Sequence, residues 1–140
     1  MALSERLIME RVIVDTGAWY AYINAKDLDH FKVREFLDSF EGKLVTSSYI
    51  FDEIITLVLA RLGHKKAVKV GQVLLNPKVV ELVRVGAADE WSAWQLFQQR
   101  SDKMYSFTDC TSFVLMRRLK LAKALTLDEH FAQEGFEVVP

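Results

Sequence analysis

Four acidic residues in separate parts of the chain combine a residue type and a placement that could bind a metal ion. They are Asp15, Glu53, Asp109 and Asp128. Asp15 and Asp128 each follow a short apolar run, and the other two lie near expected helix starts. Carboxylates gathered in one place must be neutralised, and the hard divalent ions Mg²⁺ and Mn²⁺ prefer oxygen ligands. The four residues therefore predict one acidic site that binds Mg²⁺ or Mn²⁺.

The elements that must position these carboxylates alternate between strands and helices. Residues 11–14 are typical of a buried strand, and the turn at Asp15 and Thr16 leads into apolar side chains at helical spacing. Further strands are expected at 44–45, 79–85, 124–127 and 136–139, and further helices at 29–41, 48–62, 65–75, 88–100 (with Trp91, Trp94 and Leu96 inward) and 109–119. This alternation predicts an α/β fold with a central parallel sheet flanked by helices on both faces. Ligands bind such sheets beyond the carboxyl ends of the strands, which is where Asp15 and Asp128 are expected.

The composition predicts one domain over residues 1–140, in which residues 1–8 form a short N-terminal extension. The chain has 140 residues, 51% of them hydrophobic and 26% charged, which is ordinary for a domain that buries a core. No apolar run approaches the roughly 18 residues of a transmembrane span, so we expect a cytoplasmic protein. Cys110 is the only cysteine, which rules out an internal disulfide and a thiolate metal cluster. The net charge of −1 does not identify a partner, because an acidic site would mask a local basic patch.

Each acid taken alone also has an ordinary structural explanation. Asp15 could simply end a strand, and Asp109 completes a capping pattern that begins at Ser106. Thr126 begins a similar pattern, which would place Asp128 in the first turn of a helix. Glu53 could belong to the solvated face of its helix. Taken together, the four acids are better explained by a shared site.

Other chemistries fit parts of the sequence less well than a metal site does. Asp15-Thr16-Gly17 also matches the active-site triplet of aspartic proteases, but that architecture is all-β and needs a second catalytic aspartate. A phosphatase of the Asp-x-Asp type is disfavoured because position 17 is glycine. A non-catalytic module that binds RNA or protein remains an alternative. His30 and His130 are expected to be loop or solvent-side histidines rather than general bases.

Several segments together resemble the PIN-domain ribonucleases, particularly the VapC-type toxin of toxin-antitoxin pairs. They are residues 12–21 with Asp15-Thr16-Gly17, Asp29-His30, Thr46-Ser47-Ser48 with Glu53, Ser106-Phe-Thr-Asp109-Cys110, Thr126-Leu-Asp128-Glu-His130-Phe131, and Gly135-Phe136. The resemblance spans nearly the whole chain. It implies a single PIN-like domain and a divalent-metal-dependent endoribonuclease that hydrolyses RNA phosphodiester bonds as the toxin of a type II toxin-antitoxin system.

The resemblance also implies roles for individual residues. Asp15, Glu53, Asp109 and Asp128 match the acidic quartet of the family and are expected to be its catalytic and metal-binding residues, with Mg²⁺ or Mn²⁺ as the cofactor. Thr16 and Ser106 match supporting positions that could orient a carboxylate or a water, although capping explains both equally well. For the helix ligand, matching the family pattern favours Glu53, whereas helical phase alone leaves Asp52 open.

Three partners follow from the same resemblance: an RNA substrate, a small protein antitoxin that covers the acidic groove, and a second copy of the chain in a homodimer. Arg117 and Arg118 are the favoured phosphate contacts because they are close in sequence to the proposed site. Trp19, Tyr22 and the helix 49–62 are candidates for the dimer contact.

Overall fold

The computed structural model describes residues 9–140, so the expected extension at residues 1–8 lies outside the described residues. The strands are β1 (Arg11–Val14), β2 (Lys43–Ser47), β3 (Val80–Val83), β4 (Lys123–Leu125) and β5 (Glu137–Val139). The helices are α2 (Thr16–Ile23), α3 (His30–Ser39), α4 (Ser48–Leu62), α5 (His64–Leu74), α6 (Ala87–Gln99), α7 (Phe107–Leu119) and the short α8 (His130–Gln133). The predicted alternation of strands and helices is confirmed, with boundaries that differ by a few residues.

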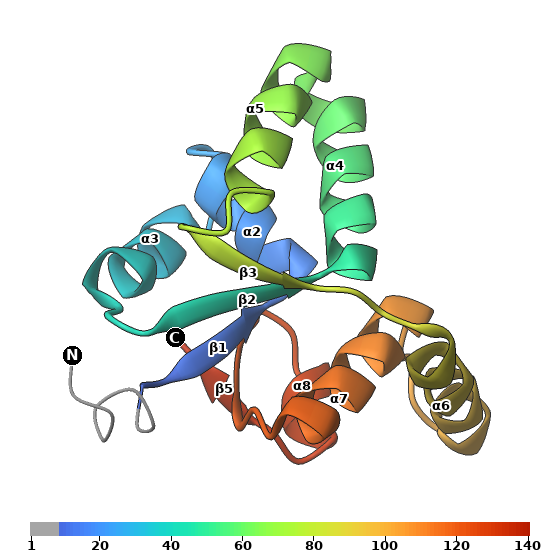
Figure 1. Ribbon diagram of the computed structural model, residues 1–140. Helices are drawn as coiled ribbons and strands as arrows, with labels where there is room; N and C mark the ends of the chain where they lie inside the picture. Colours follow the sequence, from blue (N-terminus) through green and yellow to red (C-terminus); the bar gives the residue numbers. More distant parts are fainter. Residues whose placement is uncertain (1–8) are drawn as a thin grey trace.

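All strands of the described chain pair in parallel in one sheet, in the order β3-β2-β1-β4-β5. Helices α2 to α5 cover one face of this sheet, and α6 to α8 cover the other (Figure 1). The expected α/β fold with helices on both faces is therefore confirmed. The chain first winds from β1 towards β3 and then crosses to β4 and β5, so the winding direction reverses between β1 and β4. Open parallel sheets bind ligands at such a switch point.

Strand β1 is central because its side chains are apolar and fit between two layers of helices. Val12, Ile13 and Val14 are fully buried, which is typical of a strand covered on both faces. The pairing of Val14 with Leu125 of β4 continues for one more residue, because the Asp15 amide donates to the Leu125 carbonyl at 3.0 Å. Asp15 therefore lies at the switch point as part of the sheet framework.

Helix α4 begins after a serine that caps it and ends at a glycine with a positive φ. The Ser47 hydroxyl accepts a hydrogen bond from the Ile50 amide, so Ser47 rather than Ser48 caps the helix. Gly63 has a φ of +93°, which an L side chain rarely adopts, and it separates α4 from α5.

Helix α6 differs from its sequence prediction in the direction that its aromatic side chains face. Leu96 is buried, as predicted, but Trp91 and Trp94, which were also expected to point inward, are 62% and 44% exposed, and Ala93 is buried in their place. The prediction was wrong because the helix packs mainly on α7 through its small and aliphatic positions rather than through its largest side chains. Trp19, a proposed dimer contact, is only 4% exposed and belongs to the core.

None of the helices in residues 9–140 combines the length and the apolar character needed to span a bilayer.

Candidate active site

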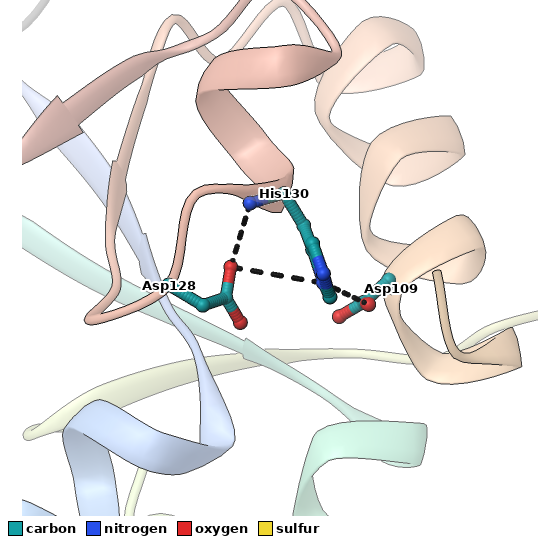
Figure 2. A group of neighbouring side chains, drawn as sticks. All are labelled: Asp109, Asp128 and His130. Carbon is teal, nitrogen blue, oxygen red and sulfur yellow. Dashed lines mark hydrogen bonds and ion pairs between the residues drawn. The ribbon is translucent and has the colours of Figure 1, made fainter. Parts of the chain in front are cut away.

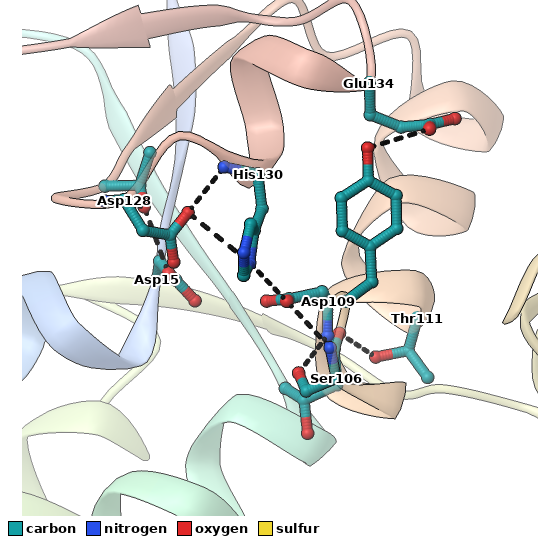
Figure 3. A network of polar contacts seen from close by, with 10 residues as sticks. Asp15, Ser106, Asp109, Thr111, Asp128, His130 and Glu134 are labelled. Atoms are coloured by element: carbon teal, nitrogen blue, oxygen red, sulfur yellow. Dashed lines mark hydrogen bonds and ion pairs between the residues drawn. The ribbon is translucent and has the colours of Figure 1, made fainter. Parts of the chain in front are cut away.

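A pocket of about 400 Å³ lies at the carboxyl ends of β1 and β4, and its walls carry all four predicted acids. Asp15 comes from the end of β1, Glu53 from α4, Asp109 from the first turn of α7, and Asp128 from the loop after β4. Figure 3 shows Asp15, Asp109 and Asp128 converging from these separate elements. The fold thus brings together residues that are up to 113 positions apart in the sequence.

Asp15 is the most deeply placed of these carboxylates. It is 7% exposed, and its Oδ2 accepts a hydrogen bond from the Thr126 hydroxyl at 3.1 Å. Burial, followed by repulsion from Asp109 and Asp128, raises the pKa of Asp15 from 3.8 to about 7. A cation in the pocket would relieve both effects, because it would replace lost hydration and screen the neighbouring charges.

Asp109 serves as a helix cap and as a wall of the pocket at the same time. The Ser106 hydroxyl accepts from the Asp109 amide at 3.0 Å, and the Ser106 amide donates to Asp109 Oδ2 at 2.9 Å. This reciprocal pair is the capping box that the sequence predicted. Burial still raises the pKa of Asp109 above its usual value, against the lowering effects of Ser106 and His130. The structural and the metal-binding interpretations are therefore compatible here.

Asp128 is held by the turn that links β4 to α8. Its amide donates to the Thr126 hydroxyl at 3.3 Å, and its Oδ1 accepts from the His130 amide at 2.9 Å. The predicted capping pattern from Thr126 to Glu129 was wrong, because Glu129 is itself the N-cap of α8 and the Thr126 hydroxyl bonds to Asp15 instead. Asp128 therefore precedes the helix and faces the pocket from a loop.

Asp52 and Glu53 differ in their position relative to the pocket. Glu53 lines the acidic pocket, whereas Asp52 is not among its lining residues. Both side chains belong to exposed positions of α4. The geometry therefore favours Glu53 over Asp52, and a ligand role for Glu53 stays a prediction.

His130 is the pocket residue to which sequence reasoning gave too little weight. Its Nδ1 lies 3.0 Å from Asp109 Oδ2 and 3.9 Å from Asp128 Oδ1, between the two carboxylates (Figure 2). Its position two residues after Asp128 was visible in the sequence. The contact with Asp109 was not, because it depends on how α8 packs beside α7.

The supporting residues Thr16 and Ser106 both line the pocket. Ser106 caps α7, as described above. The Thr16 hydroxyl is buried and finds no hydrogen-bond partner within residues 9–140. A buried hydroxyl without a partner is costly, so Thr16 fits a site that is completed by a ligand or a water.

The two arginines predicted to contact RNA form hydrogen bonds with carboxylates of the protein itself. Arg118 donates two hydrogen bonds of 2.9 Å to Asp89, and Arg117 donates to Glu134 at 2.6 Å. Both side chains remain about half exposed, so contact with phosphate stays a prediction for them. Cys110 is fully buried, as expected for a core residue, and burial raises the pKa of its thiol to about 11.

The donor atoms of the pocket fit a divalent cation. Ligand atoms of Asp109, Asp128 and His130 all lie within 4.8 Å of one another, and Asp15 adds a carboxylate whose charge the described residues leave unbalanced. Oxygen donors dominate this set, and hard ions such as Mg²⁺ and Mn²⁺ prefer them. The arrangement can hold a cation against a bound phosphate, which is the basis of metal-assisted phosphodiester hydrolysis.

Known proteins match this sequence over most of its length. The PIN domain family model matches residues 12–137. The 23S rRNA-specific endonuclease VapC20 of Mycobacterium tuberculosis is 35% identical over 130 residues, which cover 92% of this chain and 98% of the relative. Ribonuclease VapC26 of the same organism is 34% identical over 122 residues, which cover 86% of this chain and 90% of the relative.

Solved structures agree with the sequence matches. The crystal structure of VapC20, described as a Sarcin-Ricin loop cleaving toxin, has a TM-score of 0.87 to this chain and covers 92% of it and 99% of its own chain. FitAcB from Neisseria gonorrhoeae has a TM-score of 0.70 at 15% identity, covering 92% of this chain and 96% of its own, and it shows likeness of fold alone. The prediction of a PIN-domain ribonuclease of the VapC toxin type is thus confirmed. The chain belongs to the PIN domain family, among its VapC ribonucleases.

Proposed function

We propose that this protein is an endoribonuclease that uses Mg²⁺ or Mn²⁺ bound in the pocket formed by Asp15, Glu53, Asp109 and Asp128. The observation that carries the proposal is the unbalanced charge at Asp15, where burial and two neighbouring carboxylates raise the pKa to about 7. Such a group favours either a proton or a cation. At neutral pH in the presence of a divalent ion, the cation is the better partner.

The residues have separate roles in this proposal. Asp15 and Asp109, the two most buried of these four acids, hold the principal ion. Glu53 and Asp128 lie at more open positions and supply outer ligands or orient the attacking water. When bound, the ion supplies charge stabilisation at the phosphate and lowers the pKa of a coordinated water. The protein's own contribution is to hold the oxygens in place before substrate arrives.

We further propose a loop of 23S ribosomal RNA as the first substrate to test. The support is the 35% identity to VapC20, whose name specifies 23S rRNA and whose structure is described as cleaving the Sarcin-Ricin loop. Loops suit a shallow acidic pocket because their unstacked nucleotides expose the phosphodiester backbone.

Two protein partners belong to the same proposal. VapC20 is described as a toxin, and for this chain we propose a small protein antitoxin that covers the acidic pocket. We also propose a homodimer, with the exposed aromatic side chains of α6 as its contact surface. Trp91, Trp94 and Phe97 are 62%, 44% and 41% exposed, and exposed apolar surface of this kind favours association. Sedimentation of the wild type and of Trp94→Glu would test the dimer, since a charge at that position should shift the protein to a monomer.

The test of the enzymatic proposal is cleavage of defined RNAs. Wild-type protein is incubated with 23S rRNA and with an isolated loop oligonucleotide, with Mg²⁺ or Mn²⁺ and with or without a chelator. We expect cleavage that the chelator abolishes and that Asp15→Asn lacks. Cleavage that persists in the chelator or in Asp15→Asn would overturn the proposed mechanism. Metal binding without cleavage of any RNA would favour the alternative of a non-catalytic binding module.

A further inference from the structure

The hydrogen bonds to Asp109 are distributed unevenly between its two oxygens. Oδ2 accepts from the Ser106 amide at 2.9 Å and lies 3.0 Å from His130 Nδ1. Within residues 9–140, Oδ1 has no hydrogen-bond partner of this kind. One oxygen is thus occupied by the protein, and the other remains available to a cation. Figure 3 shows Ser106 and His130 approaching Asp109 from different elements.

The imidazole of His130 also packs against the Tyr105 side chain. The Tyr105 ring meets it edge to face, with ring centroids 5.4 Å apart. The Tyr105 hydroxyl donates to Glu134 at 3.2 Å, and Arg100 fixes Glu134 with two further hydrogen bonds of 2.9 and 3.1 Å. Tyr105 is 5% exposed and the Glu134 side chain 3%. The ring of His130 therefore packs against a buried, hydrogen-bonded side chain.

We propose that His130 is a positioning residue for the metal site: its Nδ1–H donates to Oδ2 of Asp109 and so directs Oδ1 of Asp109 towards the cation. This inference rests on the proposed metal-dependent function. Metal-binding carboxylates commonly need such outer hydrogen bonds, whose removal typically weakens metal binding about 10- to 100-fold. His130 thus acts through Asp109 and not on the RNA itself.

The protonation of the ring follows from its partner. An ionised carboxylate offers no proton, so the nitrogen that bonds to Asp109 Oδ2 must carry the hydrogen. With that hydrogen in place, Nδ1 has no lone pair to offer to a metal ion. Direct binding of the metal through Nδ1 would require the bond to Asp109 to break. The two arrangements therefore exclude each other and can be separated by experiment.

The test uses two matched substitutions, His130→Asn and His130→Gln. The amide of asparagine can place its N–H near the position of Nδ1, whereas the amide of glutamine reaches the position of Nε2. Manganese affinity is measured by calorimetry on the full chain without RNA, and the melting temperature without metal confirms that each variant is folded. We expect affinity within about 3-fold of wild type for His130→Asn, and a loss of about 10-fold or more for His130→Gln.

Several results would overturn the proposal. They are equal affinities in the two variants, a smaller loss in His130→Gln than in His130→Asn, or a nitrogen coupling from His130 in the pulsed electron paramagnetic resonance spectrum of the Mn²⁺ complex. A wild-type protein that binds no Mn²⁺ would overturn it together with the metal site. If the wild type binds Mn²⁺ but cuts no RNA, only the proposed function fails, and the affinities of the two variants still decide the role of His130.

Discussion

Asp15 and Glu134 are both buried carboxylates, yet their surroundings give them opposite electrostatics. Arg100 and Arg117 surround Glu134, and although burial alone would raise its pKa, their hydrogen bonds lower it to about 2. Burial raises the pKa of Asp15 to about 7, and the neighbouring carboxylates of Asp109 and Asp128 add to this effect. The contrast distinguishes an acid that is paired within the fold from the acid that we propose binds the metal ion. The protein supplies the counter-charge at Glu134, whereas Asp15 has no cationic partner among the described residues and can be neutralised by a proton or by a bound cation.

Substitution of Asp15 should have the largest effect on activity. Asp15→Asn keeps the shape and a hydrogen-bond acceptor for Thr126 but removes the charge that holds the cation. We expect RNA cleavage to fall by about 1000-fold or more, since the ion contributes several kcal/mol to the transition state. The metal-free variant should melt higher than wild type at pH 8, because a buried, repelled charge is gone. Cleavage assays and calorimetric melting at one pH would check both expectations, and a lower melting temperature would contradict the proposed electrostatics.

Substitution of Glu134 should lower the stability of the protein, in contrast to substitution of Asp15. Glu134→Gln leaves Arg100 and Arg117 without their anionic partner, and we expect a loss of about 2 kcal/mol of unfolding free energy. The two arginines are partly exposed, so water limits the cost. Denaturant unfolding measures the change, with Arg34→Gln as a control because its pair with Asp38 is exposed on both sides. Equal stability of the Glu134 variant and the control would show that the cluster is not structural.

The two acids should also give the metal-free protein opposite responses to pH. The folded pKa of Asp15, about 7, lies above its ordinary 3.8, so the folded state binds the proton more tightly and stability rises as the pH falls from about 8 towards 4. The folded pKa of Glu134, about 2, lies below its ordinary 4.5, so its stabilisation is complete above 4.5 and is lost as the pH falls towards 2.

Melting temperatures across this range should therefore pass through a maximum near pH 5 without metal. In Asp15→Asn, the increase in melting temperature between about pH 8 and pH 5 should become smaller. In Glu134→Gln, the decrease in melting temperature below about pH 4.5 should become smaller. Adding Mg²⁺ should raise the wild-type melting temperature most at pH 8, because protons compete with the ion below about pH 7. If the melting temperature of Asp15→Asn changed between about pH 8 and pH 5 as much as that of the wild type, Asp15 would not be the cause of this pH dependence.

The smallest expected effect concerns the more open wall of the pocket. Glu53→Gln should reduce cleavage by about 10-fold, because Glu53 lines the acidic pocket and is expected to supply an outer ligand or to orient the attacking water. Its neighbour provides the matched control: Asp52→Asn should stay within about 2-fold of wild type. Single-turnover cleavage rates at saturating Mg²⁺ would measure both. The reverse order of effects would show that helix α4 presents Asp52 to the substrate.

Much of the fold was predictable from local patterns. The fully apolar run at residues 12–14, the serine cap before Ile50 and the glycine after Leu62 each reflect a preference that acts within a few residues. Strand and helix alternation then limits the sheet to a parallel one. The positions of Asp15 and Asp128 at one edge followed from that architecture, because each comes directly after a strand.

The local sequence pattern did not predict the orientation or the hydrogen-bond partner of a side chain that had two similar alternatives. Trp91 and Trp94 fit an inward-facing stripe by spacing, but they are exposed, whereas Ala93 and Leu96 are buried on a helix that packs mainly on α7. Thr126 had the spacing of a helix cap, but its hydroxyl bonds to Asp15 across the sheet. In both cases contacts between distant segments outweighed the local preference.

The sequence by itself determined which residue types are available and where strands end, since hydrophobic periodicity and caps are properties of neighbouring residues. Only the tertiary structure decided that Glu53 rather than Asp52 lines the pocket and that His130 meets Asp109, 21 residues away in the chain. The same holds for the balance of charge at Asp15 and Glu134. A pKa depends on burial and on charges brought near in space, and neither quantity is contained in the order of residues along the chain.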